Sequence, residues 1–268
     1  MKTVNLRGKK ALITGASSGF GTDFARILAE KGMDLIITAR RAEKLNALKA
    51  EIEEKYGVQV RVIAMDLSGF DAAGKLYAEV RDENIDMLIN NAGYGMYGWF
   101  ERQDAAELDR MVQLNVVSAF ALANFFVKDL AAKNSGWILN TASFAAFNPT
   151  PFYAVYGATK AFLMNFSVAL RTELKKSGRN VAVTAFCPGF TATEFVQTAG
   201  QKRSYFLEKT IGKSYPAAKE AIDALLRNKP VVMPRFMNRS AAFCLRFMPR
   251  SVAANAAFMS IKEEERDF

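Results

Sequence analysis

The chain has 268 residues, half of them hydrophobic, with a mean hydropathy near zero, which suits one large α/β domain or two small ones and gives ample material for a core. It contains no histidine, which excludes a Ser-His-Asp triad, a Cys-His dyad and most zinc sites, so acid–base chemistry must come from Tyr, Lys, Asp, Glu or Cys. The net charge of +9 favours anionic ligands, but the basic residues are dispersed and form no recognition motif, so we predict no nucleic-acid binding.

Short apolar runs alternate with longer helical patterns along the chain. The runs are rich in Val, Ile and Leu and are continuous, as strands buried on both faces of a parallel sheet require. The expected strands are 11–14, 34–39, 60–65, 86–90, 137–142, 181–186 and 230–233, and the expected helices lie near 19–31, 41–56, 71–83, 101–131, 153–177 and 215–228. The pattern predicts a single α/β domain over residues 1–268, with a Rossmann-type, doubly wound parallel sheet of about seven strands and helices on both faces.

The sequence shows no pattern typical of a membrane span, a secretory signal or a disulfide framework. No apolar run reaches about 18 residues and the first residues lack an uninterrupted apolar stretch, so we expect neither a spanning helix nor a secretory signal. Cys187 and Cys244 stand in neither a CxxC pair nor a metal-ligand spacing. We therefore expect reduced thiols, no metal site and a cytoplasmic protein.

A glycine-rich turn joins the first strand to the first helix in ALITGASSGFGTDFARILAE. Gly15, Gly19 and Gly21 allow a tight turn and a close backbone approach to a pyrophosphate, and the helix N-terminus offers N–H groups to the anion. This position predicts a dinucleotide site. The alternative is a helix start that merely uses glycine and serine.

The second strand ends in Ala39, Arg40 and Arg41, where an NAD-binding fold usually carries Asp or Glu. A guanidinium can bind a 2′-phosphate that a carboxylate would repel, so we predict NADP(H), with Arg40 as the main contact and Arg41 as a helper. The alternative is that both arginines cap a solvent-exposed edge. Asp66, at the end of the third strand, either accepts a hydrogen bond from the adenine amino group or caps the following helix.

Tyr156 and Lys160 are four residues apart and share one face of the expected helix 153–177, and Tyr153 lies near the same face. The ammonium group next to the phenol is expected to lower the pKa of Tyr156, so that Tyr156 can exchange a proton with a carbonyl or alcohol oxygen. Tyr153 is expected to form part of a substrate pocket.

Six motifs occur in one order: TGASSGFG, NNAG (90–93), Asn115 in QLNVV, Ser143 in NTASF, YGATK (156–160) and CPGFTAT (187–193). Over about residues 8–195 they resemble the motif set of the short-chain dehydrogenase/reductase family. The resemblance implies that Tyr156 is the proton donor or acceptor, that Lys160 lowers its pKa and contacts the nicotinamide ribose, and that Ser143 hydrogen-bonds the substrate oxygen. It implies that Asn115 helps to hold a water chain leading to Lys160. Taken singly, Asn115 could mark a helix kink and Ser143 could be an ordinary strand-end hydroxyl.

The same resemblance implies further cofactor contacts in the turns that follow the strands. Besides Gly15, Gly19, Arg40, Arg41, Asp66, Tyr156 and Lys160, these are Ser17, Ser18, Phe20, Leu67, Asn91, Ala92, Gly93, Pro188, Gly189, Thr191 and Thr193. It also suggests a homodimer or homotetramer formed through the helices near 101–131 and 153–177.

Aromatic residues crowd the expected reacting groups. Phe144, Phe147, Tyr153, Phe190 and Phe195 predict an apolar pocket for a bulky ketone or secondary alcohol, such as a steroid or a long-chain 3-oxoacyl group, with 190–228 as the substrate-binding loop and helix. The alternative is that these residues belong to the core and a subunit interface.

The last segment, 234–268, is predicted to be an amphipathic basic tail. On one helix, Arg235, Arg239, Arg246 and Arg250 would fall within about 60° of one another beside a phenylalanine sector, with Pro249 interrupting the helix near its end. Such a helix fits peripheral contact with a membrane surface or a position beside the entrance for an anionic substrate. The alternative is a helix that packs on the substrate loop or on a neighbouring subunit.

We therefore predict an NADP(H)-dependent oxidoreductase that interconverts a ketone and a secondary alcohol on a hydrophobic small molecule. The alternatives are a catalytically inactive NADP(H)-sensing protein of the same fold, a 3-oxoacyl-type reductase of lipid metabolism at a membrane surface, and a reductase or epimerase of nucleotide sugars. The last usually shows a different glycine spacing and a larger substrate domain.

Overall fold

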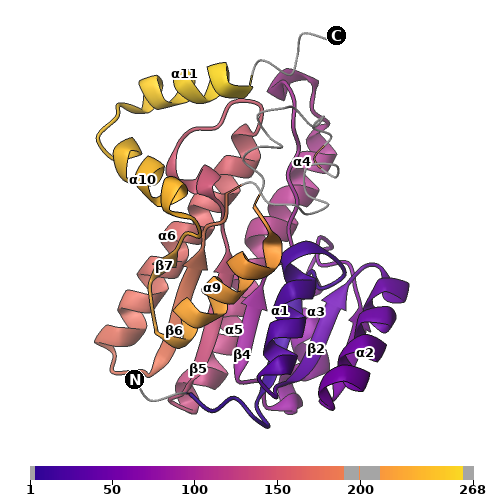
Figure 1. Ribbon diagram of the computed structural model, residues 1–268. Coiled ribbons are helices and arrows are strands. Elements are labelled where there is room, and N and C mark those ends of the chain that lie inside the picture. Colours follow the sequence, from indigo (N-terminus) through magenta and orange to yellow (C-terminus); the bar gives the residue numbers. More distant parts are fainter. Residues whose placement is uncertain (1–3, 190–198, 200–211, 262–268) are drawn as a thin grey trace.

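The computed structural model describes residues 4–189, 199 and 212–261, and its centre is one parallel sheet of seven strands (Figure 1). The strand order is β3-β2-β1-β4-β5-β6-β7, so the chain winds outward from β1 and then crosses to its other side, which is the doubly wound pattern. The predicted fold class is confirmed. The strands are β1 Lys10–Thr14, β2 Asp34–Ala39, β3 Val60–Ala64, β4 Met87–Asn90, β5 Gly136–Thr141, β6 Val181–Phe186 and β7 Val231–Val232.

Successive residues of each strand pack into two separate cores, because successive side chains point to opposite faces of a sheet. In β2, Leu35 and Ile37 pack into the core on one face and Ile36 into the core on the other. The first core is completed by α1 Gly19–Glu30, α2 Ala42–Tyr56 and α9 Ser214–Leu226, and the second by α3 Ala72–Val80, α5 Ala119–Ala132 and α6 Ala154–Lys176. Double-sided burial explains why the strands are continuous apolar runs.

The region expected as one helix over 101–131 is built from several pieces. A 3₁₀ turn at Phe100–Arg102 precedes Asp104, whose carboxylate accepts a 2.9 Å hydrogen bond from the N–H of Glu107 and so caps α4 Ala105–Val112. The segment Gln113–Ser118 is π-helical and leads into α5. The π-helical segment lies at Asn115, which the sequence singles out, and such segments are frequent at functional sites.

The continuous helical run Ala105–Ala132 is long and apolar enough to cross a membrane by length and composition alone. Of the apolar window in this run, 39% is buried, and Leu122, Phe126 and Leu130 are among the residues buried in the second core, against the sheet.

Beyond β7, the chain forms two helices, so the expectation of one helix interrupted near its end is wrong. They are α10 Phe236–Leu245 and α11 Arg250–Ile261, and we call them, together with the turn 246–249 between them, the α10–α11 hairpin. Pro249 stands between them because its ring cannot continue α10, while its carbonyl accepts a 3.0 Å hydrogen bond from the N–H of Ala253 and starts α11. The α10–α11 hairpin lies beyond the carboxyl ends of the strands (Figure 1).

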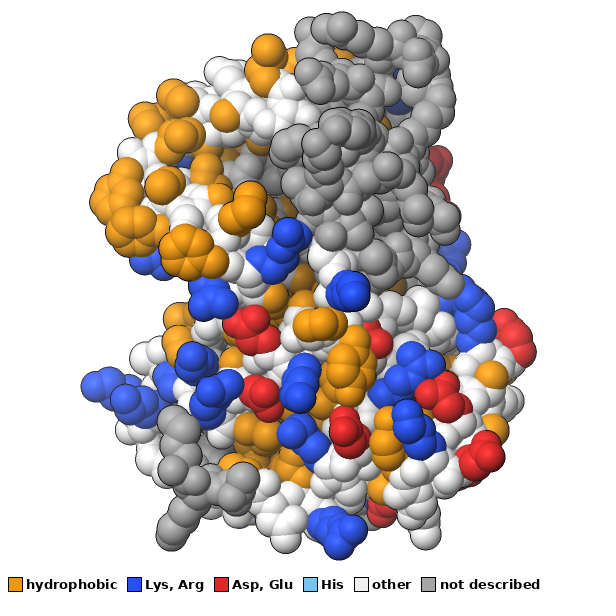
Figure 2. Space-filling model, in the orientation of Figure 1, with side chains coloured by type: hydrophobic (Ala, Val, Ile, Leu, Met, Phe, Trp, Pro, Cys, Tyr) orange, Lys and Arg blue, Asp and Glu red, His pale blue; other side chains and the backbone are white. Residues whose placement is uncertain are grey.

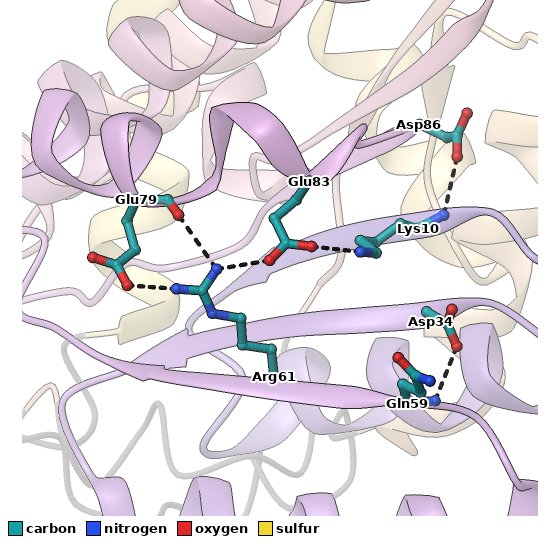
Figure 3. A network of polar contacts seen from close by, with 7 residues as sticks. All are labelled: Lys10, Asp34, Gln59, Arg61, Glu79, Glu83 and Asp86. Carbon is teal, nitrogen blue, oxygen red and sulfur yellow. Dashed lines mark hydrogen bonds and ion pairs between the residues drawn. The ribbon is translucent and has the colours of Figure 1, made fainter.

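A network of charged side chains joins β1 and β3 to the end of α3 (Figure 3). Glu83 bridges Lys10 Nζ at 2.5 Å and Arg61 Nη1 at 2.8 Å, and Arg61 Nη2 also contacts Glu79 at 2.5 Å. The backbone N–H of Lys10 donates to Asp86 at 3.0 Å. These contacts tie the amino edge of the sheet to the crossover helix and leave the carboxyl edge for the site.

Candidate active site

A cavity of about 710 Å³ lies at the carboxyl edge of the sheet. Residues of the turns that follow β1 to β6 line this cavity, and ligands of doubly wound folds bind at this edge of the sheet. Nearly all described residues predicted to contact the cofactor line it, namely Gly15, Ser17, Ser18, Gly19, Phe20, Arg40, Arg41, Asp66, Leu67, Asn91, Ala92, Gly93, Tyr156, Lys160, Pro188 and Gly189. Thr191 and Thr193, with Phe190 and Phe195, lie outside the described residues.

The glycine-rich turn has the shape of an anion cradle. A Cβ on Gly21 would collide with the carbonyl of Gly15, and a Cβ on Gly15, whose φ is +67°, would lie 2.8 Å from Cα of Ala92. In the described part of the chain, the side chain of the N-cap residue Ser18 accepts no hydrogen bond from α1. The first N–H groups of that helix can therefore donate to a ligand. The turn therefore fits the pyrophosphate of a dinucleotide.

The two arginines after β2 have different surroundings. Arg41 lies against the glycine-rich turn, where its guanidinium donates to Oγ of Ser17 at 3.1 Å and to the carbonyl of Ser17 at 3.3 Å. Arg40 is exposed and also lines the cavity. Both therefore place positive charge beside the turn.

Asp66 lines the cavity and does not cap α3, whose N-cap is Asp71, so the capping alternative is wrong. Its carboxylate instead closes a local turn by accepting from the N–H and the hydroxyl of Ser68 at 2.9 and 2.7 Å. Burial raises the pKa of Asp66, but these hydrogen bonds and the charges of Arg40 and Arg110 outweigh it and leave the pKa below its usual value. Asp66 is thus an ionised acceptor at neutral pH.

Thr14, at the end of β1, holds the NNAG turn, and the sequence analysis did not identify it. Its hydroxyl accepts from the N–H groups of Asn91 and Ala92 at 3.0 and 2.9 Å and donates to the carbonyl of Ile89 at 3.3 Å. Asn91 returns a bond from Nδ2 to the carbonyl of Thr14 at 3.1 Å. A threonine that ends a strand has no motif of its own, so only the fold shows this role.

Ser143, Tyr156 and Lys160 meet in the same cavity. The hydroxyl of Ser143 hydrogen-bonds that of Tyr156, and Ser143 Oγ also accepts from the N–H of Ala145 at 3.2 Å. Lys160 is 4% exposed, and its Nζ donates to the carbonyl of Thr141 at 2.7 Å. The α-helical spacing therefore places the phenol and the ammonium on one face of α6, as predicted.

The lowered pKa that the sequence predicts for Tyr156 is not found. Burial raises the pKa of Tyr156 to about 12, and the hydrogen bond from Ser143 only partly opposes this. Burial also lowers the pKa of Lys160 to about 8. Desolvation therefore dominates over the attraction between ammonium and phenolate, so that Tyr156 carries its proton at neutral pH and Lys160 can exchange one.

Asn115 lies behind the reacting groups and is fully buried. Its Oδ1 accepts from the N–H of Tyr94 at 3.1 Å, while Nδ2 donates to the carbonyl of Tyr94 at 2.9 Å and to Thr159 Oγ1 at 3.1 Å. A Cβ on Gly93 would lie 2.8 Å from Asn115 Oδ1 and 3.3 Å from Lys160 Nζ. Only glycine lets the NNAG turn approach both side chains this closely.

On the substrate side, Phe144 and Tyr153 line the cavity as predicted, but Phe147 does not. Phe147 packs instead against the neighbouring core and against Phe144, with ring centroids 6.4 Å apart. The α10–α11 hairpin adds a wall that the sequence analysis did not identify, formed by Ala241, Cys244, Leu245, Met248, Ala253, Ala256, Ala257 and Ser260.

Comparisons with known proteins agree with this geometry. A family model described as "short chain dehydrogenase" matches residues 9–204. The chain is 39% identical over 199 residues to the serine 3-dehydrogenase of Agrobacterium fabrum, covering 72% of this chain and 77% of the relative. It is 32% identical over 196 residues to the very-long-chain 3-oxoacyl-CoA reductase of Bos taurus, covering 71% of this chain but only 62% of the bovine protein's length.

Among solved structures, a short-chain dehydrogenase from Sphingobium yanoikuyae in complex with NADPH is similar, with a TM-score of 0.80 and 30% identity over 97% of this chain and 96% of that one. The chain therefore belongs to the short-chain dehydrogenase family.

Proposed function

We propose that the protein is an NADP(H)-dependent oxidoreductase that interconverts a ketone and a secondary alcohol on a bulky hydrophobic substrate. The observation that carries the proposal is the hydrogen-bonded pair of Ser143 and Tyr156 hydroxyls on the cavity wall, with buried Lys160 on the same helix face as Tyr156. An inactive sensor protein would have no need of this constellation.

Each residue has a role that follows from its chemistry. The bound nicotinamide supplies or accepts the hydride. Tyr156, whose pKa is about 12, donates its proton to the carbonyl oxygen in the reductive direction, while Ser143 hydrogen-bonds the same oxygen. Lys160, whose pKa is about 8, can return a proton to Tyr156 near neutral pH, and Asn115 positions the segment around it.

The preference for NADP(H) is supported by Arg40 and Arg41, which follow β2 where NAD-binding folds usually carry a carboxylate. The NADPH bound to the similar Sphingobium protein supports the same reading. Gly15, Ser17, Ser18, Gly19 and Phe20 would hold the pyrophosphate. The 2′-phosphate would contact Arg40 mainly, because Arg41 already binds Ser17.

The hydrophobic substrate is supported by the apolar residues Phe144, Tyr153, Leu245 and Met248, which line the same cavity as the reacting groups. The bovine relative's name points to a long-chain 3-oxoacyl substrate, and the Agrobacterium relative's name to a small polar one. The apolar wall favours the first class. Within the segment 190–228 that the sequence predicts as the substrate-binding loop and helix, α9 lines no part of the cavity and packs in the first core. We therefore assign substrate binding to the α10–α11 hairpin within the tail 234–268.

The test is NADPH oxidation with a panel of ketones, in wild type and Tyr156→Phe. We expect wild type to reduce lipophilic ketones and Tyr156→Phe to be inactive while it still binds NADPH in fluorescence titrations. If wild type binds NADPH but reduces no ketone, the protein is a sensor. If only small polar ketones are reduced, the hydrophobic substrate class is wrong.

We also propose a cytoplasmic homo-oligomer formed through α5 and α6. Phe120 on α5 is 38% exposed and Phe162 on α6 is 41% exposed, with ring centroids 6.2 Å apart, and Phe166 stacks on Phe162 at 5.9 Å. Such a patch suits a self-complementary interface. Light scattering should give a dimer or tetramer for wild type and a smaller species for Phe162→Glu.

A further inference from the structure

We propose that the α10–α11 hairpin docks the enzyme on an anionic lipid surface and admits lipophilic substrate from that surface. The docking stands on surface chemistry alone, whereas the admission of substrate rests on the proposed function. The hairpin has one side on the cavity and another on solvent, and the two sides have different chemistry.

The solvent side of the hairpin is strongly apolar. Phe236 is 78% exposed, Phe243 58% and Phe247 76%. The other large hydrophobic side chains exposed on the hairpin are Met237, Met248, Val252 and Met259. Figure 2 shows hydrophobic side chains gathered over this end of the molecule, whereas charged side chains are dispersed over the sheet-bearing body. Single exposed apolar residues are ordinary, but a cluster of this kind marks an interaction site.

The charge of the hairpin is of one sign. Arg235, Arg239, Arg246 and Arg250 are exposed, and the sequence contains no acidic residue between Asp223 and Glu263. Arg239 pairs with Glu220 of α9 at 3.1 Å, outside the hairpin. Arg246 and Arg250 flank the turn that carries Phe247. Aromatic side chains flanked by arginines are the combination that inserts into the headgroup region of an anionic bilayer.

A second copy of the chain fits this surface poorly. A two-fold interface places the same patch on both subunits, so it would bring arginine against arginine with no carboxylate of the hairpin to neutralise them. Anionic lipid headgroups supply the missing negative charge, and acyl chains accommodate Phe243 and Phe247. Charge complementarity therefore selects the bilayer.

The cavity side of the hairpin connects this surface with the reacting groups. Met248 lines the cavity and is also 37% exposed, so it lies at the mouth. α11 is held at its other end by Phe258, which stacks on Phe152 with ring centroids 5.3 Å apart and contacts Trp99 at 6.1 Å. The turn between the helices therefore sits at the mouth, on the side expected to meet the lipid, and a lipophilic ketone can pass Met248 into the cavity.

Docking is tested by co-sedimentation of the full chain with vesicles of phosphatidylcholine alone or with 30 mol% phosphatidylglycerol, a composition chosen for the assay. We expect wild type to sediment with the anionic vesicles and to be released by salt. Phe243→Ser/Phe247→Ser and Arg246→Glu/Arg250→Glu should each weaken binding by about tenfold or more. Phe70→Ser removes a 94% exposed aromatic near α3 and should bind like wild type.

Equal sedimentation of wild type and both hairpin variants would overturn the docking proposal, as would equal binding of wild type to both vesicle types. A dimer in light scattering that Phe243→Ser/Phe247→Ser abolishes, without vesicle binding, would assign the surface to a second copy and also overturn it. Circular dichroism and NADPH binding should be unchanged in the variants, which excludes misfolding.

Substrate admission is tested by kinetics with two ketones, one borne by vesicles and one dissolved in water. We expect Phe243→Ser/Phe247→Ser to raise KM at least fivefold for a long-chain ketone embedded in anionic vesicles, with kcat unchanged, and to leave KM unchanged for a short water-soluble ketone. An unchanged KM for the vesicle-borne ketone overturns admission while docking stands. Absence of turnover for every ketone in wild type contradicts the proposed function, and sedimentation then still decides on docking.

Discussion

The ammonium of Lys160 lies 5.7 Å from the ring centroid of Tyr156 and donates its hydrogen bond to the carbonyl of Thr141, at 2.7 Å. Lys160 is thus positioned by the end of β5 rather than by the phenol. Because Lys160 is buried, its charged form is destabilised and its pKa falls to about 8. In this pair Tyr156 donates the proton, and Lys160, which titrates near neutrality, can supply the proton that replaces it.

Replacing the hydroxyl of Tyr156 or of Ser143 should lower the rate of proton transfer without preventing cofactor binding. Tyr156→Phe should lower kcat by about 10²-fold to 10⁴-fold because it removes the proton donor to the substrate oxygen. Ser143→Ala should lower kcat less, since it removes a hydrogen bond and leaves the donor. Steady-state kinetics measures both, and Thr150→Ala, a change of another hydroxyl on the cavity wall, is the control. A Tyr156→Phe enzyme with full kcat would contradict the assignment.

Lys160 should make stability depend on pH in a defined direction. Its folded pKa of about 8 lies below its usual 10.5, so the unfolded chain binds more protons between these values and stability rises with pH there. The free energy of unfolding of Lys160→Met should therefore exceed that of wild type, and the difference should be largest below pH 8. It should be at most about 3 kcal/mol, less the contribution of the hydrogen bond that the substitution removes. The advantage should shrink towards pH 10.5 in urea titrations. A difference that stays constant between pH 7 and 10 would contradict the depressed pKa.

Gly93→Ala should damage the site more than the fold. The added methyl group would lie 2.8 Å from Asn115 Oδ1 and 3.3 Å from Lys160 Nζ, which forces both out of position. We expect kcat to fall by about tenfold or more, as misplaced catalytic groups do, with a smaller change in melting temperature. Gly69→Ala is the matched control for Gly93→Ala, because its added methyl group would meet only the carbonyl of Asp66, at 3.8 Å. Equal effects of the two changes would show that the close approach at Gly93 is unimportant.

The arginines after β2 should set the cofactor preference. Arg40→Ala should raise KM for NADPH by about tenfold, equivalent to about 1.4 kcal/mol, and leave KM for NADH unchanged because NADH lacks the 2′-phosphate. Arg41→Ala should weaken both cofactors, since it also releases Ser17. Arg81→Ala, at the end of α3, serves as the control for net charge. Equal losses for NADPH and NADH in Arg40→Ala would place the 2′-phosphate elsewhere.

The network at the amino edge of the sheet should affect stability and not catalysis. Hydrogen bonds from Lys10 and Arg61 hold the pKa of Glu83 below its usual 4.5, so its contribution is present above that value and is lost as pH falls through the folded pKa. Glu83→Gln should cost about 1 kcal/mol at pH 7 and progressively less below pH 4.5, with kcat unchanged. Asp82→Asn, 93% exposed at its side chain, is the control in thermal denaturation. A loss that persists at pH 3 would rule out a charge effect.

The sequence predicted the sheet almost to the residue because short continuous apolar runs such as Leu35, Ile36 and Ile37 suit strands that are buried on both faces of a parallel sheet. It predicted the reacting pair because a four-residue spacing fixes a shared helix face. It could not predict that Phe147 turns away from the cavity or that α11 covers it, because both depend on tertiary packing. It also misjudged the pKa of Tyr156, since desolvation depends on the whole surrounding structure rather than on the neighbour four residues away.

The π-helical segment Gln113–Ser118 limits how this protein can be altered by insertion or deletion. A π-turn holds one residue more than an α-turn, so deleting one residue there would restore regular hydrogen bonding. The flanking helices α4 and α5 would then keep their orientation, but a deletion of Asn115 itself would remove the hydrogen bonds to Tyr94 and Thr159. A shorter, more regular helix would fold without the side chain that holds Tyr94, so the length of this helix is as much a part of the site as its residues.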